Sequence, residues 1–441
     1  MKTICLTITA VLALAYTLPG QEISPYLFGQ NHWMDRSDEG RRPGYLYMLW
    51  PKIKESGVKS IRIGGGGYQR RLPSRDKLIA IVDNIQRIGA EPILQVPSHY
   101  SAEEAGALVE QFNKSGRTPV RYWSIGNEPL LHDRDGIEKV YDYVRRIAPA
   151  MKAIDPSIKI FVFDECTLFE EPHQRIVGGD LDLTGKDPAE NWLIDGITFH
   201  RYPNTRSDFD RDDVVFNGPR DIRRQIEQLK GMIELANKKH GRTGDACLSW
   251  GLTEFNVTTS NPDREIAGVG NTSFLAGQFF AEIYGLGMEY GAFTMAPWCI
   301  NETDRLSTDF GFLGLPPEFH PRSSFYHTQM MVSRMRGKFL PTTSSERYVK
   351  TIGSRNDDTV CVMLLNRDQK RDFDFDLILN SNGESGRSLV VRADVGLDVT
   401  LSGHIPHETT VLFVLSTSGK VKKQYTYGLT HNLEHQPPEV K

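Results

Sequence analysis

Short apolar runs alternate with amphipathic stretches from Ile23 to about Arg336. The apolar runs have the length of buried strands, and the stretches between them place apolar residues with a helical period. The repeated unit, a strand followed by a helix, is roughly 30 to 50 residues long. Eight strands are expected, at Tyr26–Gly29, Ser60–Ile63, Pro92–Val96, Tyr122–Ile125, Ile158–Phe163, Gly196–Phe199, Leu248–Thr253 and Ala292–Ala296.

The helical pattern recurs in the gaps between these strands, at Leu46–Glu55, Ser74–Ile88, Ala102–Lys114, Gly136–Ile154, Asp221–Lys239, Ser273–Gly287 and Arg322–Arg336. The gap after the fifth strand holds a loop-rich insert, Glu171–Pro188, and no helix is expected there. Strands joined through a helix run parallel, with right-handed crossovers. The pattern therefore predicts a (β/α)₈ barrel over residues 21–336.

An open, doubly wound sheet is the alternative architecture, and it usually carries a glycine-rich phosphate turn after its first strand. Here the first strand is followed by Gln30-Asn31-His32-Trp33, which is polar and aromatic. The glycine run Gly64–Gly67 follows the second strand and lacks the Lys-Ser/Thr of a P-loop. The glycines are therefore interpreted as tightly packed backbone, and the barrel is favoured.

Beyond Gly337 the apolar period changes from helical to two. This alternation, interrupted by turn signals, predicts an antiparallel β-sandwich over residues 337–418, with the N-terminal residues as candidates to complete it. Residues 419–441 are polar, with Pro437-Pro438 near the end, and a frayed tail is expected. The strands are expected at Tyr348–Ile352, Thr359–Leu365, Phe373–Leu379, Ser388–Ala393, Val399–Leu401 and Thr410–Leu415.

The first 20 residues have the pattern of a secretory signal. Lys2 precedes an apolar run from Ile4 to Leu14, and small and turn-forming residues follow up to Gly20. The run is too short to span a bilayer, and no longer apolar run follows it, so a membrane span is not expected. Cys5 lies before the apolar run, which differs from the arrangement of a lipoprotein. We expect an exported protein, periplasmic or extracellular.

The composition, 39% hydrophobic and 24% charged, is ordinary for a soluble globular protein. The net charge of −4, without a basic cluster interleaved with aromatic residues, argues against nucleic acid as a partner. The four cysteines after the signal allow a disulfide or free thiols, and their spacing does not suggest a structural metal. These are Cys166, Cys247, Cys299 and Cys361, and glycosylation sequons begin at Asn256, Asn271 and Asn301.

Two glutamates stand where a barrel of this kind places its reactive groups, at the carboxyl ends of strands. Glu128 follows the fourth strand in Asn127-Glu128-Pro129, and Glu254 follows the seventh. Cleavage of a glycosidic bond needs one group to protonate the leaving oxygen and another to capture the anomeric carbon. The pattern therefore predicts Glu128 as general acid/base and Glu254 as nucleophile. A separation of roughly 5–5.5 Å would give retention, and roughly 6.5–9.5 Å would give inversion.

Asn127-Glu128-Pro129 and Glu254 together resemble the retaining glycoside hydrolases of clan A, the "4/7" superfamily. The resemblance covers the barrel, implies hydrolysis without a cofactor, and gives roles to further residues. It implies that Arg62 binds the nucleophile, that Tyr202 of His200-Arg-Tyr202 contacts it, and that Trp298 stacks on a sugar. The trailing β module is similar to those of the β-xylosidase, α-L-arabinofuranosidase and β-glucuronidase families.

Each assignment has a structural alternative. Asn127 is expected to donate to a sugar hydroxyl, or else to form the turn; Arg62 could instead make a structural ion pair. His200 and Tyr202 could be hydrogen-bonded packing, and Glu165 is the rival carboxylate, interpreted as a rim residue. Trp33 and His99 are substrate-binding candidates by position, and Trp123 is assigned to the core.

The predicted partner is an oligosaccharide or polysaccharide. A barrel that binds carbohydrate without cutting it is the first rival, and a transglycosylase using the same pair is the second. Arg70, Arg71 and Arg201 leave recognition of a uronic acid open. The identity of the sugar, the linkage, and exo or endo action stay open at this stage.

Overall fold

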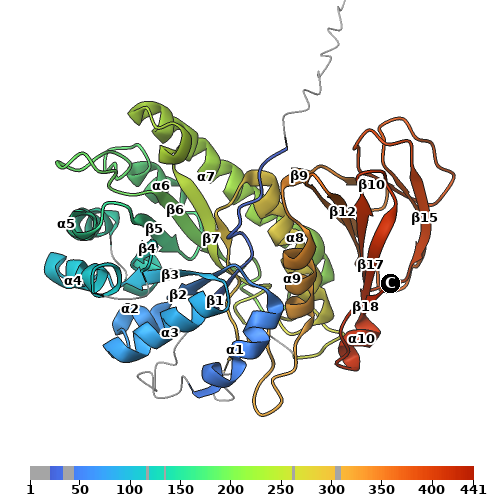
Figure 1. The fold of residues 1–441 in the computed structure, drawn as a ribbon, viewed down its shortest axis with the longest axis horizontal. Helices are drawn as coiled ribbons and strands as arrows, with labels where there is room; N and C mark the ends of the chain where they lie inside the picture. Colours follow the sequence, from blue (N-terminus) through green and yellow to red (C-terminus); the bar gives the residue numbers. More distant parts are fainter. Residues whose placement is uncertain (1–19, 33–43, 116–118, 134–135, 261–263, 303–308) are drawn as a thin grey trace, which may run out of the picture.

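The computed structural model describes residues 20–32, 44–115, 119–133, 136–260, 264–302 and 309–441. A barrel and a β-sandwich lie side by side, with helices α8 (Phe274–Tyr290) and α9 (Ser323–Arg334) between them (Figure 1). Trp33 and the expected signal at residues 1–20 lie, except for Gly20, outside the described residues. No helix within the described ranges is long and apolar enough to cross a membrane.

The barrel sheet contains eight parallel strands in chain order, which confirms the predicted fold. The ring closes where Phe28 bridges Met295 and the Met295 N–H donates to the Leu27 carbonyl. The first strand begins at Gly29, later than predicted, because Leu27 and Phe28 make this closing contact. The strands are β1 (Gly29–His32), β2 (Ser60–Ile63), β3 (Glu91–Val96), β4 (Tyr122–Ile125), β5 (Lys159–Glu165), β6 (Gly196–Arg201), β7 (Ser249–Phe255) and β8 (Thr294–Met295).

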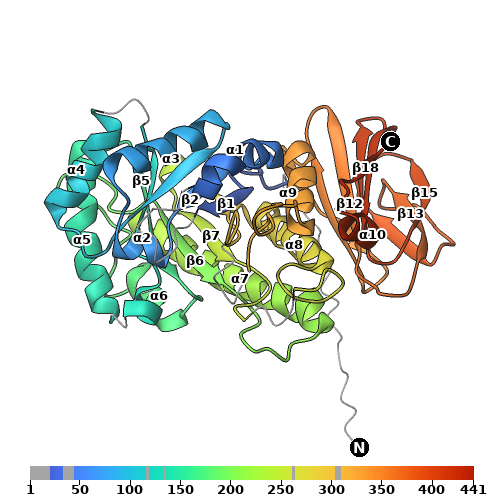
Figure 2. The same cartoon turned by 90° about the horizontal axis from the view of Figure 1, so that it is seen from below.

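Helices surround this barrel (Figure 2). The insert predicted without a helix contains a short one, α6 (Glu170–Ile176), which the apolar pattern missed because only His173 and Ile176 of it are buried. The others around the barrel are α1 (Gly44–Ser56), α2 (Gly66–Arg70), α3 (Arg75–Arg87), α4 (Ala102–Asn113), α5 (Ile137–Ile154) and α7 (Gly218–His240), with shorter turns η1 (Pro129–Asp133), η2 (Asp213–Asn217) and η3 (Gly244–Ala246).

The sandwich packs a six-stranded sheet, β18-β17-β16-β12-β11-β9, against a four-stranded sheet, β10-β14-β13-β15. Its central strand β12 is buried on both faces: Met363 and Leu365 join the core shared with the barrel, whereas Val362 and Leu364 join the core inside the sandwich. The elements are β9 (Lys338–Leu340), β10 (Thr343–Ser344), β11 (Val349–Arg355), β12 (Thr359–Asn366), β13 (Phe373–Ile378), β14 (Leu389–Arg392), β15 (Thr400–Ile405), β16 (Thr409–Ser416), β17 (Val421–Gly428), α10 (Leu429–Leu433) and β18 (Glu439–Val440).

The segment 419–441 is part of the sandwich, and the expectation of a frayed tail is wrong. Strand β17 pairs with β16, and Tyr427 is buried against Phe274 and Tyr326. The strand was not predicted because its first residues are exposed and polar, among them Lys422 and Lys423. At the other terminus, Glu22 bridges Lys338 of β9, so N-terminal residues do extend this sheet.

The four cysteines after the expected signal are free thiols in the structure. The asparagines of the three sequons are all buried, at 0%, 2% and 7% exposure, and such side chains cannot accept a glycan in the folded protein. They are Asn256, Asn271 and Asn301. The sequons therefore add nothing to the prediction of export.

Candidate active site

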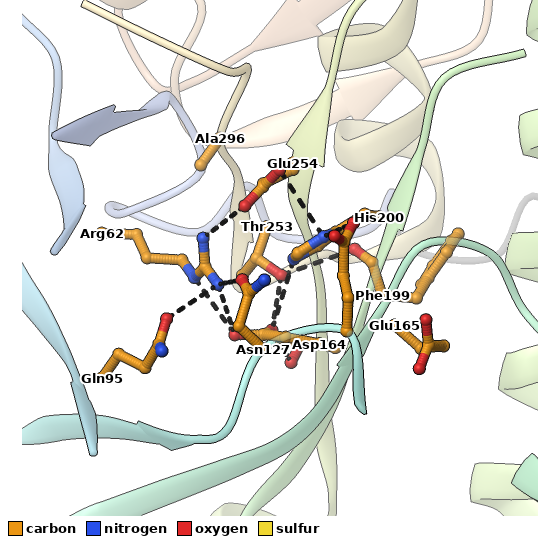
Figure 3. Close-up of polar contacts among 12 residues, drawn as sticks. Arg62, Gln95, Asn127, Asp164, Glu165, Phe199, His200, Thr253, Glu254 and Ala296 are labelled. Carbon is orange, nitrogen blue, oxygen red and sulfur yellow. Dashed lines mark hydrogen bonds and ion pairs between the residues drawn. The ribbon is translucent and has the colours of Figure 1, made fainter. Parts of the chain in front are cut away.

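The two glutamates meet at the carboxyl end of the barrel. Figure 3 shows Glu254 there, with Arg62 beside it. Glu254 is the sixth residue of β7, and Glu128 follows β4 with a φ of 45°. A non-glycine residue in this left-handed region costs conformational energy, and such positions are concentrated at functional sites. The Glu128 N–H donates to the Asp164 carbonyl at 2.7 Å, which holds the turn in place.

The carboxylates of Glu128 and Glu254 are nearly buried, at 7% and 6% exposure, and both approach the same ring nitrogen of His200. One oxygen of each carboxylate and one ring nitrogen of His200 all lie within 4.8 Å of one another. His200 Nδ1 is 2.9 Å from Glu128 Oε1 and 3.6 Å from Glu254 Oε2. This spacing fits the retaining arrangement of roughly 5–5.5 Å better than the wider inverting gap.

Arg62 of β2 is fully buried beneath the pair and donates to Glu254 Oε1 at 2.8 Å. The structure therefore brings together the two residues that the resemblance pairs. An arginine is suited to this position because its planar fork reaches several acceptors at once. The same guanidinium also donates to Asn31, Gln95, Asn127 and Asp164.

Burial and charge act in opposite directions on the pKa values of this cluster. Burial raises the pKa of Glu254 above its ordinary value, although the charges of His200 and Arg62 oppose the rise. Burial lowers the pKa of His200, but the nearby Glu254 and Glu128 outweigh it, and the net shift is upward. The charge of Arg62 thus favours ionisation of Glu254, but burial outweighs it and the pKa of Glu254 is raised.

Of the other predicted residues, Tyr202 contacts Glu254, and Trp298 lies beside the glycine run that follows β2. The Tyr202 hydroxyl donates to Glu254 Oε2 at 3.0 Å. Trp298 is partly buried, and its six-membered ring lies against Gly65. Gly65 has a φ of 98°, and a Cβ atom on this residue would lie only 2.5 Å from Trp298 Cη2. A Cβ on Gly64 would lie 2.7 Å from Arg62 Cζ. Gly64 and Gly65 are therefore tightly packed backbone, as interpreted from the sequence, and they make room for Arg62 and Trp298, whereas a Cβ on Gly66 would meet only Arg70, at 3.7 Å.

No family model and no curated protein matches this chain by sequence. Its structure, however, is similar to solved structures of carbohydrate-active enzymes. A family 51 α-L-arabinofuranosidase from Bifidobacterium longum has a TM-score of 0.65 at 14% identity, covering 91% of this chain and 98% of that one. The α-L-arabinofuranosidase from Thermotoga maritima gives 0.63 at 12%, covering 90% and 97%. A family 44 xyloglucanase from Paenibacillus polymyxa gives 0.60 at 11%, also covering 90% and 97%.

This chain has their fold. The match extends over nearly the whole of both chains, so it includes the sandwich as well as the barrel. The fold implied by the resemblance to clan A glycoside hydrolases is thereby confirmed.

Three sequence candidates lie outside this cluster. His99 is exposed after β3 with its ring edge-on to Tyr100, and no hydrogen bond joins it to the carboxylates among the described residues. Arg201 is paired with Asp221 at 2.5 Å, away from the carboxylates. Glu165 is fully buried, so its interpretation as a rim residue is wrong; it accepts the Leu130 N–H at 2.7 Å and supports the loop after Glu128.

A buried polar layer lies below the glutamates and was not predicted from the sequence. Asp164 lies 3.0 Å from Arg62, and Asn31 donates to the carbonyls of Thr253, Ala296 and Pro297. A carboxylate directly after the apolar run Ile160–Phe163, still within the buried strand, was the available signal for Asp164, since buried charges are rare without a partner. Trp123, assigned to the core, is fully buried.

The spacing of Glu128, His200 and Glu254 also matches that of three metal ligands. Arg62 places a permanent positive charge 2.8 Å from Glu254, which disfavours a cation at the same carboxylate. The arrangement is therefore better suited to covalent and acid/base chemistry than to holding a metal.

Proposed function

We propose that this protein is a retaining glycoside hydrolase of clan A that cleaves O-glycosidic bonds in a plant or microbial oligosaccharide or polysaccharide. The observation that carries the proposal is the buried pair of strand-end carboxylates, Glu128 and Glu254, with oxygens within 4.8 Å. A pair at this distance leaves no room for a water between them and the anomeric carbon, which favours direct attack by one carboxylate.

In the first step, a Glu254 oxygen attacks the anomeric carbon while the Glu128 carboxyl group donates its proton to the leaving oxygen. The bond from the anomeric carbon to the leaving oxygen breaks, and a glycosyl ester forms. Arg62 and Tyr202 each donate to Glu254, and these bonds fix the carboxylate and stabilise its charge.

In the second step, Glu128 is ionised and removes a proton from water. The water oxygen attacks the anomeric carbon, the ester bond to Glu254 breaks, and the sugar leaves with its original configuration. His200, 2.9 Å from Glu128, is placed to stabilise the ionised form by donating from Nδ1. Both carboxylates return to their starting protonation states.

Residues around the pair supply the proposed sugar contacts. Trp298 offers a partly exposed ring, and Asn127 stands beside Glu128 with its Oδ1 held by Arg62 at 2.7 Å. The named substrates of the similar structures, arabinosides and xyloglucan, favour a plant cell-wall glycan. Such a substrate lies outside the cell, in agreement with the proposed export.

A panel of aryl glycosides, assayed with wild type, Glu254→Ala and Glu128→Ala, tests the proposal. Glu254→Ala should lose well over nine-tenths of turnover, since a nucleophile contributes several kcal/mol, roughly 10³-fold or more. Azide should partly rescue both variants and give glycosyl azides of opposite anomeric configuration. Glu110→Ala, an exposed position on α4, is the control and should match wild type.

More than a tenth of wild-type turnover in Glu254→Ala would overturn the assignment of the nucleophile. A protein that binds glycans but cleaves none would instead be a carbohydrate-binding barrel. Transfer to an added acceptor sugar, in preference to water, would identify a transglycosylase with the same residues.

A further inference from the structure

Strand β5 ends in a β-bulge directly below the carboxylate pair. Val162 pairs with Ile197 and Glu165 pairs with Phe199, so Phe163 and Asp164 together oppose the single residue Thr198. Phe163 has a φ of 69°. Bulges re-aim a side chain and are found beside active sites. This one places the Asp164 carboxylate inside the barrel, where it is 1% exposed (Figure 3).

Asp164 holds both halves of the catalytic pair. Its Oδ2 lies 3.0 Å from Arg62 Nη2, and Arg62 in turn holds Glu254 at 2.8 Å. Its backbone carbonyl accepts the Glu128 N–H at 2.7 Å. Thr253 donates to its Oδ1 at 2.7 Å, and Thr198 donates to the same oxygen, so the carboxylate cannot rotate away.

We infer that Asp164 is a positioning residue, which acts through Arg62 and through the Glu128 backbone to set the two catalytic carboxylates against each other. The inference rests on the proposed glycosidase function. Asp164 does not face the sugar, because Arg62 and His200 lie between it and Glu254 (Figure 3). Its effect on the reaction is therefore one of geometry and charge.

The charge of Asp164 also influences the protons of the site. Its Oδ1 is 4.0 Å from His200 Nε2, and it shares the single cation Arg62 with Glu254. Removing this anion makes every neighbouring acid lose its proton more readily, so both limbs of the pH profile move to lower pH. The titratable groups facing it are Arg62 from β2, Glu128 after β4, His200 from β6 and Glu254 from β7.

The test compares Asp164→Asn with Asp195→Asn. Asp195 is also a nearly buried carboxylate, paired with Lys152 at 2.7 Å, but it lies before β6 at the opposite end of the barrel. For Asp164→Asn, kcat should fall about 100-fold with KM changed less than about threefold, since misplacement of catalytic groups costs that much. Both limbs of kcat/KM should move down by roughly one pH unit. Asp195→Asn should lose stability and keep the wild-type profile.

If Asp164→Asn fails to fold, Thr198→Val removes one donor to the same carboxylate and should lower kcat about tenfold at unchanged KM. A wild-type kcat and pH profile in Asp164→Asn, or in Thr198→Val where the first does not fold, overturns the inference. Equal losses in Asp195→Asn overturn it too, because they would indicate general destabilisation. If Glu254→Ala loses turnover while Asp164→Asn does not, the inference alone fails; if wild type cleaves no glycoside, the proposed function fails.

Discussion

Arg62→Lys is the most informative substitution in this site, because it keeps the positive charge and removes the planar guanidinium group. The guanidinium donates to five different side chains from three nitrogens: Asn31, Gln95, Asn127, Asp164 and Glu254. A lysine ammonium has three donors on one atom. Gln95 Oε1 also accepts the Gly65 N–H, so at least one of the other four acceptors loses its donor in a place that is closed to bulk water.

The expected cost follows from this difference. A buried acceptor left without a partner costs about 1–3 kcal/mol. That is a large part of a typical folding free energy of about 5–15 kcal/mol. Turnover should fall about 100-fold as well, because the ammonium cannot hold Glu254 and Asp164 in their present relation.

Urea unfolding followed by tryptophan fluorescence measures the first effect, and aryl glycoside kinetics below the unfolding transition measures the second. Arg242→Lys is the matched control: Arg242 is 4% exposed and donates to the carbonyls of Thr184, Ile194 and Ala246, far from the site. It should lose stability and keep kcat. An Arg62→Lys protein within about 1 kcal/mol of wild type, with more than half its kcat, would refute the reasoning.

Three further outcomes are expected. Tyr202→Phe removes the donor to Glu254 Oε2 and should lower kcat about tenfold in steady-state kinetics. An unchanged kcat would show that this hydrogen bond does not contribute to catalysis. Gly65→Ala should displace Trp298 and change its fluorescence together with KM, and unaltered values of both would contradict the packing. The free energy of unfolding should fall as the pH drops below 6.5, by about 2 kcal/mol per buried histidine at pH 5. The reason is that these histidines bind protons below pH 6.5 in the unfolded chain, but only at much lower pH in the folded protein. Equal free energies of unfolding at pH 7 and pH 5 would contradict this expectation. The histidines, with pKa values lowered by burial, are His32 (about 4), His173 (about 3) and His327 (about 4).

The strand order and the positions of the two glutamates could be predicted because both depend on local pattern. A buried strand has an apolar run, and a reactive residue follows its end, so Glu128 and Glu254 are visible in the sequence. The layer around Asp164 could not be predicted, because its contacts join β2, β5, β6 and β7 over long separations. Its position also depends on the β5 bulge, which has no glycine to mark it.

Strand β17 was missed for a different reason. Its outer half is exposed and charged, so the period of two is weak, whereas Tyr427 near its end is fully buried. Pairing with residues 409–415 of β16 compensates for that weak pattern. Helix α8 shows the opposite case: it is apolar on nearly every side because it is covered by the barrel and by the sandwich.

The bridge between Glu22 and Lys338 imposes an order on the assembly of the chain. Residues 20–22 emerge early from the ribosome, but the strand edge that receives them is made roughly 300 residues later. Until then, the start of the chain has no sheet to join. The sandwich thus contacts segments from both ends of the barrel sequence. A barrel expressed without the sandwich would leave the segment at Glu22 without a strand to pair with. It would also expose the apolar side of α8 that packs against the sandwich.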